Sequence, residues 1–468
     1  MGLTPLLLSR LQFAFTISYH IIFPSFTIGL AAWLMLLEGL HLATGRPVYQ
    51  RLFSFWLKIF GVAFGLGVVS GVVMAFEFGT NWSRMSEATG PIQGPLLAYE
   101  SFTAFALEAS FFGVLIFGRE RVSKLFYFFA AAMVALGTTL SAFWIMANNS
   151  WMQAPTGYVV VNGVYVPNDW GKIVFSPVMW VRFPHMLLAS YLTGAFCVAA
   201  TGAWYRLRET YAVEGKAMLR AGLILASLLI PAQLFLGHLN GDYVHDRQPT
   251  KFAAIEARWH DEQPAAEVLI ALPDARRETN HFELKVPVLG SLIATSTLNS
   301  KEVGLTDFPR RDRPPVDIPF FSFRIMVGCG LLMMAIAWIG TLLTMLGTLE
   351  RSRLLLWGVF FSFPLPFVAT LTGWFTAEVG RQPWTVFGLM RTADAVTPTL
   401  TVHETILSLA MFVCIHTLIF TFGAFYIYRL IRTGPVEAEI APADTPGANR
   451  PLGLSTAAGQ PLSQESTP

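Results

Sequence analysis

Residues 354–384 read LLLWGVFFSFPLPFVATLTGWFTAEVGRQPW, and this stretch decides the class of fold. No charged residue interrupts it before Glu378. Because about 20 apolar residues cross the hydrocarbon core of a bilayer, the run predicts a transmembrane helix. A carboxylate at the end of such a helix is costly unless a partner neutralises it. Arg381 is the nearest group of opposite charge along the chain, so an Arg–Glu ion pair is one explanation of Glu378.

The composition extends this interpretation to the whole chain. Of the 468 residues, 54% are hydrophobic and 13% are charged, whereas soluble domains carry about 25% charged residues. The net charge of +2 and the lack of a basic patch interleaved with aromatics argue against nucleic acid as a partner. The fold class predicted is all-α, a polytopic membrane protein with nine transmembrane helices in bundles. The nine spans are expected at residues 11–40, 53–78, 96–118, 126–147, 183–205, 219–240, 320–346, 354–376 and 401–430.

The charges in the loops predict the orientation and the division of the chain. Alternate short loops are rich in Arg and Lys, which places them in the cytoplasm, with the N-terminus outside and the C-terminus cytoplasmic. Residues 1–240 then hold helices 1–6, and residues 318–432 hold helices 7–9. Residues 241–317 form a charged outer loop, too long for a simple connection. Residues 433–468, rich in Pro, Ala, Gly and Ser, predict a disordered cytoplasmic tail.

Ionisable residues inside the predicted spans are functional hypotheses by default, and four of them matter most: His20, Glu100, Glu108 and His185. Each of them, taken alone, is equally consistent with an interhelical polar contact. On a regular helix Glu100 and Glu108 are about 12 Å apart along the axis and about 80° apart around it, so one broad face presents both.

The candidate residues lie in the outer halves of their helices, and the cytoplasmic halves are nearly bare of ionisable groups. Glu38 and His41, at the cytoplasmic interface, are the main exceptions and are expected to be solvated. His185 and Met326 lie at matched depth near the outer ends of the fifth and seventh spans. A neutral imidazole and a thioether suit the two axial positions of a low-spin haem.

Several blocks, in family order, resemble subunit I of the cytochrome bd family of quinol oxidases. They are LSRLQFAFTISYHIIFPSFTIGL, EFGTNW, YESFTAFALEASFFG, FWIMANNSWMQAPTG, KFAAIEARW, FRIMV and GWFTAEVGRQPW. The resemblance covers most of the chain but not the tail or the details of the outer loop, which is the Q loop of the family. The short loop resembles that of the short Q-loop, cyanide-insensitive oxidase branch.

The resemblance implies haems near the outer, periplasmic face. His185 and Met326 correspond to the axial ligands of a low-spin haem b. His20 and Glu378 correspond to ligands of two high-spin haems, one haem b and one haem d, without an assignment of either residue to either haem. In this branch a further haem b can stand in place of haem d. Ligation to ferric iron would also explain a carboxylate at the position of Glu378.

The resemblance also implies roles in proton and quinol chemistry. Glu100 and Glu108 match carboxylates near the high-spin pair that are linked to proton supply and haem binding. Lys251 and Glu256 match Q-loop residues implicated in quinol oxidation.

The resemblance bears on three further residues. Trp374 resembles an aromatic residue that lies between haems. Arg381 is a candidate to neutralise haem propionates or a ligand carboxylate. Glu77 occupies a position where some relatives have Gln, and its role stays open.

The function implied is that of the haem-containing subunit of a terminal quinol oxidase in the bacterial cytoplasmic (inner) membrane. It would oxidise quinol at the outer face and reduce O₂ to water, with protons taken from the cytoplasm and no pumping. The implied partners are a haem-free subunit II, a small single-helix subunit and membrane lipid. The residues alone leave two alternatives open: a dihaem cytochrome b that transfers electrons without oxygen chemistry, and a proton-coupled transporter, although transporter sites tend to lie near the midplane.

Overall fold

The computed structural model describes residues 2–435, and in this range nine helical segments are long and apolar enough to cross a membrane, as predicted. The tail expected at residues 433–468 lies almost wholly outside the described residues. The spanning helices are α1 (Pro5–Thr44), α2 (Pro47–Thr80), α3 and α4 (Ser83–Tyr99 and Ala106–Phe117), α5 (Lys124–Gln153), α7 (Met179–Leu207), α8 (Ala212–Arg247), α11 (Asp317–Met345), α12 and α13 (Arg353–Phe361 and Leu365–Val379) and α15 (Val402–Thr433).

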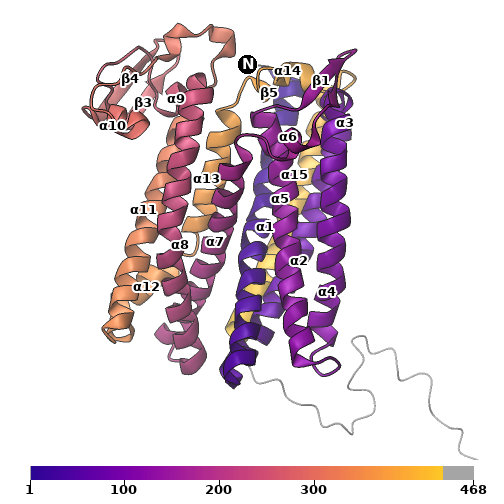
Figure 1. Cartoon of the computed structure of the whole chain (residues 1–468), viewed down its shortest axis with the longest axis vertical. Helices are drawn as coiled ribbons and strands as arrows, with labels where there is room; N and C mark the ends of the chain where they lie inside the picture. The colour runs from indigo at the N-terminus through magenta and orange to yellow at the C-terminus, as the bar shows by residue number, and fades with distance from the viewer. Residues whose placement is uncertain (1, 436–468) are drawn as a thin grey trace, which may run out of the picture.

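The helices form two groups that meet at α7 (Figure 1). Helices α1 to α5 and α15 make one group, and α8 and α11 to α13 make the other, while α7 contacts α1, α5, α8 and α12. The contact between α1 and α7 is close at a pair of glycines. A Cβ atom on Gly29 would lie 2.8 Å from the backbone nitrogen of Gly194. Small residues are what allow membrane helices to approach this closely.

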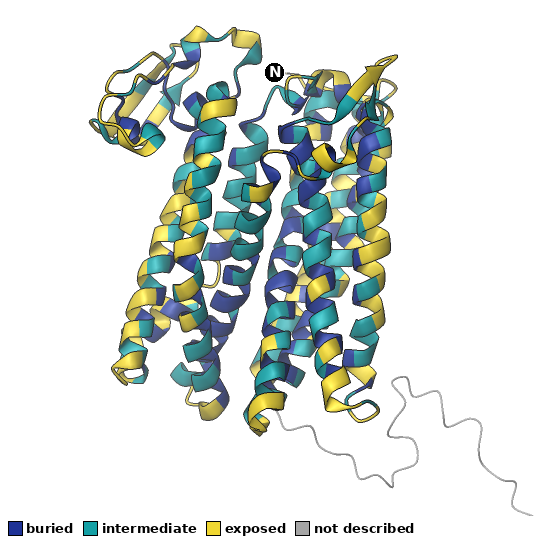
Figure 2. Ribbon diagram, in the orientation of Figure 1, coloured by how far each residue is buried: buried dark blue, intermediate teal, exposed yellow. Residues whose placement is uncertain are grey.

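Apolar side chains cover the outside of the bundle as well as its core. The largest core cluster includes Leu30, Phe53, Trp56 and Tyr127, from α1, α2 and α5. The outward faces of α8, α11 and α12 carry many exposed residues (Figure 2). On α11 the exposed residues include Trp338, which is 49% exposed. Apolar residues on an outer face are expected where lipid replaces water as the solvent.

Two of the spanning segments are not regular helices. Residues 362–364 separate α12 from α13, because Pro364 has no N–H to continue the helix. In the third span, the π-helical segment Glu100–Phe105 (η1) joins α3 to α4. This span starts at Ser83 rather than at residue 96, so Glu100 lies midway along it and does not open it.

The connections at one end of the bundle carry nearly all the remaining structure. They contain β1 (Tyr158–Val161), β2 (Val164–Pro167), α6 (Trp170–Val174), α9 (Pro249–Ile255), β3 (Glu267–Asp274), β4 (Thr279–Val286), α10 (Leu289–Thr295), η2 (Leu305–Asp307), η3 (Arg310–Asp312), β5 (Trp384–Val386), β6 (Met390–Arg391) and α14 (Thr392–Ala395). Figure 1 shows the N-terminus at the same end, which we call the outer end. The 3₁₀ turn η4 (Leu349–Arg351) lies at the opposite, inner end.

The long loop is a small folded unit. Its strands β3 and β4 pair antiparallel as a two-stranded hairpin. Helix α8 continues to Arg247, past residue 241, so the first residues of the predicted outer segment are helical.

Glu38, at the inner end, is not solvated as predicted. Its side chain is 1% exposed, and its two oxygens accept hydrogen bonds from Arg119 Nη1 at 3.0 Å and Nη2 at 2.7 Å. The guanidinium also lies 4.0 Å from the ring centroid of Tyr127. A bidentate partner removed in sequence by many residues is not visible in the local pattern, which explains the error.

Candidate functional site

Glu378, at the outer end of α13, is surrounded by donors from three other segments. Its Oε1 accepts hydrogen bonds from Asn149 Nδ2 at 3.1 Å and Gln153 Nε2 at 3.2 Å, on the last turns of α5. Its Oε2 lies 2.6 Å from Arg381 Nη2. Arg182 Nη2, on α7, lies 3.7 Å from Oε1. The Arg–Glu ion pair left open by the sequence is therefore present, and a second guanidinium joins it.

Lys251 reaches the same place from α9. Its Nζ donates to Gln153 Oε1 at 3.3 Å, and its side chain is buried. Burial, aided by the positive charge of Arg182 and opposed by Glu378, lowers the pKa of Lys251 to about 7. Burial also lowers the pKa of Arg381, again against the attraction of Glu378. We call the six residues Asn149, Gln153, Arg182, Lys251, Glu378 and Arg381 the outer polar cluster.

The outer polar cluster has spare hydrogen-bond donors. Among the described residues, no acceptor reaches Arg182 Nη1 or Arg381 Nε and Nη1, although all three atoms are buried. Buried donors in folded proteins nearly always have a partner. Guanidinium N–H groups pair best with carboxylates and phosphates. The cluster is therefore built to receive a further anionic group beside Glu378.

His185 and Met326 each sit against a glycine of a neighbouring helix. A Cβ atom on Gly237 of α8 would lie 3.3 Å from His185 Cε1, and one on Gly373 of α13 would lie 3.0 Å from Met326 Sδ. His185 Nε2 is 3.4 Å from Gln233 Nε2. Its Nδ1 is buried and has no partner among residues 2–435. Because an amide nitrogen only donates, His185 Nε2 is the ring nitrogen that carries the lone pair. This nitrogen and the thioether of Met326, on side chains each given room by a glycine, are available as ligands.

His20 has a defined partner on one side of its ring. Its Nδ1 lies 2.9 Å from Ser70 Oγ on α2. A Cβ atom on Gly71 would lie 3.1 Å from His20 Cε1. If Nδ1 donates to Ser70, Nε2 keeps its lone pair, which is the arrangement found in metal-ligating histidines.

Glu100 and Glu108 both face α5. Ser141 Oγ donates to Glu100 Oε1 at 2.9 Å. Gly137 lies one turn before Ser141 on α5. A Cβ atom added there would lie 2.5 Å from Glu108 Cγ, so this glycine makes room for Glu108. The π-helical segment inserts an extra residue between the carboxylates, so they are about 20° apart around the helix rather than about 80°. The two groups are thus better aligned than a regular helix predicts.

Glu256 contacts a different helix from those that Lys251 contacts. Its Oε2 accepts a hydrogen bond from Arg324 Nη2 at 2.9 Å. Arg324 also donates to the carbonyl of Ile255 and lies two residues before Met326 on α11. The two loop residues therefore connect α9 to two places: Lys251 to the outer polar cluster, and Glu256 to the helix that carries Met326.

The comparison with known families covers nearly the whole chain. Residues 8–435 match the family described as cytochrome bd terminal oxidase subunit I. The chain belongs to this family.

Individual relatives agree with the assignment to the cytochrome bd family. The chain is 34% identical to "Cytochrome bd ubiquinol oxidase subunit 1" of Bacillus subtilis, over 93% of this chain and 95% of the relative. It is 33% identical to "Cytochrome bd-II ubiquinol oxidase subunit 1" of Escherichia coli, over 92% and 96% of the two chains. Among solved structures, the bd oxidase from Geobacillus thermodenitrificans matches with a TM-score of 0.85 and 26% identity, over 93% of this chain and 100% of that one.

Membership in the cytochrome bd family makes this a multi-pass membrane subunit of a haem-dependent terminal oxidase, which assembles with a subunit II. It sets aside the transporter and the electron-transfer protein without oxygen chemistry. The residues present fit haem. His185 and His20 each offer a ring nitrogen, Met326 offers a thioether, and the unpaired N–H groups of Arg182 and Arg381 suit propionate carboxylates.

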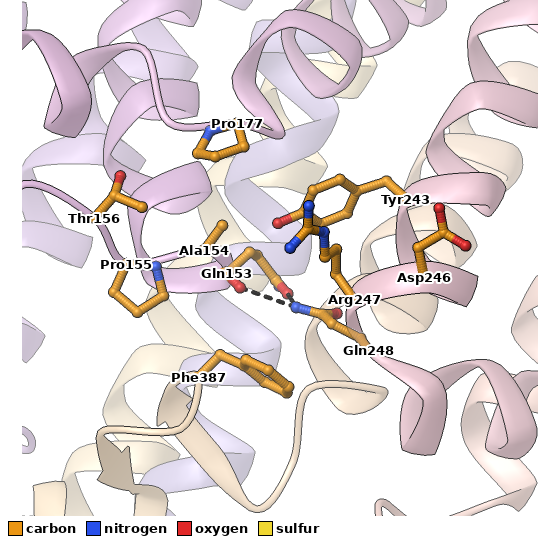
Figure 3. Close-up of a pocket in the computed structure, with 10 residues that line it drawn as sticks. All are labelled: Gln153, Ala154, Pro155, Thr156, Pro177, Tyr243, Asp246, Arg247, Gln248 and Phe387. Atoms are coloured by element: carbon orange, nitrogen blue, oxygen red, sulfur yellow. Dashed lines mark hydrogen bonds between the residues drawn. The ribbon is translucent and has the colours of Figure 1, made fainter.

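A pocket of about 530 Å³ adjoins the outer polar cluster in this cytochrome bd subunit (Figure 3). Tyr243 and Arg247 of α8 line one side of it, and Phe387 lines another. Gln248 Nε2 donates to the carbonyl of Gln153 at 2.9 Å at its edge. Its volume lies in the range of small-molecule sites, and Gln153 joins it directly to Glu378.

Two other predicted residues have different surroundings. Trp374 is partly buried against a cluster that contains Met146 and Met179. Glu77 is fully buried on α2, where its Oε1 accepts a hydrogen bond from Thr16 Oγ1 at 2.6 Å. No contact in the described residues links Glu77 to the outer polar cluster.

Sequence reasoning missed four residues of the site in this family member: Asn149, Gln153, Arg182 and Arg324. The first two stand inside the quoted block FWIMANNSWMQAPTG, and the arginines precede His185 and Met326 by three and two positions. Polar residues near the outer ends of apolar spans were the available signal.

Proposed function

We propose that this chain is the haem-bearing subunit of a quinol:O₂ oxidoreductase that oxidises quinol at its outer end. The observation that carries the proposal is the outer polar cluster. It combines a carboxylate with unpaired guanidinium donors beside a 530 Å³ pocket, in a chain of the cytochrome bd family. When bound, the haems supply a route for single electrons from quinol to O₂.

His185 and Met326 are the proposed axial ligands of a low-spin haem b, and His20 and Glu378 are proposed ligands of the two high-spin haems, one of type b and one of type d or b. The lone pair on His185 Nε2 and the glycines beside His185, Met326 and His20 support these roles. Arg381 and Arg182 would hold propionates and keep Glu378 ionised. Trp374 is proposed to pack between haems.

Lys251 and Glu256 are proposed to bind the two hydroxyls of quinol. Both side chains are buried at the base of the loop. With a pKa of about 7, Lys251 is neutral for much of the time at physiological pH, so its amine can accept a hydrogen bond from a hydroxyl. The alignment with the Escherichia coli relative runs over 496 positions and covers 92% of this chain, so that relative contains insertions that this chain lacks.

Glu100 and Glu108 are proposed to carry protons toward the oxygen-reducing site. Both lie on the third span and face α5, and Glu108 is 6% exposed. With the N-terminus outside and the C-terminus in the cytoplasm, protons released from quinol leave outside while those consumed come from the cytoplasm. This separates charge without pumping. The proposed complex includes subunit II and a small single-helix subunit.

The deciding experiment uses the complex of this chain with its subunit II, purified in detergent. We expect low-spin and high-spin bands in the optical spectrum, extracted haem b with or without haem d, and O₂ consumption with ubiquinol or menaquinol. In vesicles, as many protons should appear outside as electrons leave quinol, and no more. A preparation with a full haem complement that consumes no O₂ with either quinol would contradict the proposal.

A further inference from the structure

Two carboxylates share one arginine at the base of the long loop. Arg324 Nη2 lies 2.9 Å from Glu256 Oε2 and 3.3 Å from Glu267 Oε1, so the same nitrogen serves both. The exposed fraction of the side chain is 17% for Arg324 and 7% for Glu256. For Glu267 it is 14%. The three groups are thus largely removed from water.

One guanidinium neutralises one carboxylate, and a second anion in the same buried place is disfavoured. The other charged group nearby is Arg258, whose Nη2 is directed to the carbonyl of Ala266 at 3.4 Å. From α11, the ring of Phe320 covers the Arg324 guanidinium at 4.1 Å. Burial first, and the charge of Glu256 second, raise the pKa of Glu267 to about 8, although Arg324 and Arg258 act in the opposite direction. At neutral pH Glu267 therefore holds a proton beside Arg324.

The two carboxylates face different surroundings. Glu256 follows α9, on the side of the loop that contacts the helix carrying Met326. Glu267 is the first residue of β3 and pairs with Val286 at the open end of the hairpin. Strand β4, beside it, is exposed along most of its length. The pair thus connects the inside of the loop to a solvent-exposed hairpin.

We propose that Glu256 and Glu267 form a proton relay in which Glu267 releases quinol protons to the outer solvent. The relay rests on the proposed oxidation of quinol at this loop. A quinol O–H bond breaks, its proton bonds to the Glu256 carboxylate, and the electron goes to the acceptor that the oxidase activity supplies. Glu267 gives its proton to water and then takes the proton from Glu256. Arg324 pairs with Glu256 at rest and with Glu267 once the Glu267 proton has left.

The test compares Glu267→Gln with Glu283→Gln in the intact oxidase. Glu283 lies on the same hairpin but pairs with Lys285 rather than with Arg324. In Glu267→Gln we expect kcat for quinol oxidation to fall about tenfold with KM unchanged, and the ionisation near pH 8 to vanish from the kcat profile. Glu283→Gln should match the wild type. Infrared spectra of the resting enzyme should show a protonated carboxyl band that titrates near pH 8 and is missing in Glu267→Gln.

A wild-type kcat profile in Glu267→Gln, or an unchanged infrared band, would overturn the relay. If Glu267→Gln does not assemble, Glu267→Asp replaces it in the test. Because Glu267→Asp keeps a carboxyl group, its kcat profile should retain the ionisation near pH 8. A profile of Glu267→Asp without this ionisation would also overturn the relay. Failure of the proposed function looks different, because the wild-type complex itself would then not oxidise quinol.

Discussion

The two ends of the helix bundle treat buried charge in opposite ways. At the inner end, Glu38 is 1% exposed and both of its oxygens are held by Arg119, so the pair is closed. At the outer end, Glu378 faces Arg381 and Arg182, but both guanidiniums keep unpaired N–H groups among the described residues. In the closed pair, neither Glu38 nor Arg119 has a buried polar atom left without a partner among the described residues. An open cluster has capacity for a ligand, which is why we place function at the outer end.

The largest expected effect follows from replacing each carboxylate in turn. Glu378→Ala should lose one high-spin haem per subunit and nearly all O₂ turnover, whereas Glu38→Gln should keep the haems and lose about 3 kcal/mol of stability, because Arg119 is left unpaired. Haem extraction per mole of protein and thermal inactivation in detergent measure the two effects. Arg381→Ala should retain the haem with a shifted potential. If it instead reproduces Glu378→Ala in full, Glu378 is an ion-pair partner and no ligand.

The low-spin site gives a second way to sharpen the comparison. His185→Ala should remove the low-spin absorbance and quinol-driven haem reduction while the protein still inserts, because the axial nitrogen is lost. Met326→Leu should do the same with less structural disturbance. Optical spectra of the dithionite-reduced complex are the measurement, with Met333→Leu, a buried methionine deeper on the same helix, as the control. A normal low-spin band in His185→Ala would rule out this ligand pair.

The two carboxylates that face α5, Glu100 and Glu108, should show an intermediate effect on turnover. Glu108→Gln should slow O₂ reduction about tenfold or more while haem reduction by quinol stays fast, because an amide cannot pass a proton. Stopped-flow absorbance separates the two steps. Wild-type turnover in this variant would show that Glu108 is a hydrogen-bonded packing residue.

The smallest effect concerns the pH dependence of quinol binding. Burial lowers the pKa of Lys251 to about 7, so the side chain is an ammonium below that pH and a neutral amine above it. Because the neutral amine accepts a hydrogen bond from quinol, kcat/KM should rise a few-fold from pH 6 to pH 8. Lys251→Met should lower kcat/KM at pH 8 and flatten this rise. If the rise of kcat/KM with pH persists unchanged in Lys251→Met, that rise comes from the ionisation of another group.

Much of the architecture could be predicted from the sequence. The nine spans follow from apolar length alone, since a bilayer leaves few alternatives to a helix of about 20 residues. The residues Glu378 and Arg381 were identifiable for the same reason: a charge beside a long apolar run is rare enough to be noticed. The errors fell where local pattern says little, at the early start of the third span at Ser83 and at the burial of Glu38.

The partners of those charges were decided by the tertiary structure alone. The sequence by itself determined a membrane-spanning helical chain with candidate ligands near its outer end, because hydropathy and residue type are properties of single segments. It did not determine that Arg182 and Gln153 would meet Glu378, or that Glu256 and Glu267 would share Arg324. Those contacts join helices and strands distant in the chain. Pairing between distant segments depends on how whole helices pack, which no local pattern encodes.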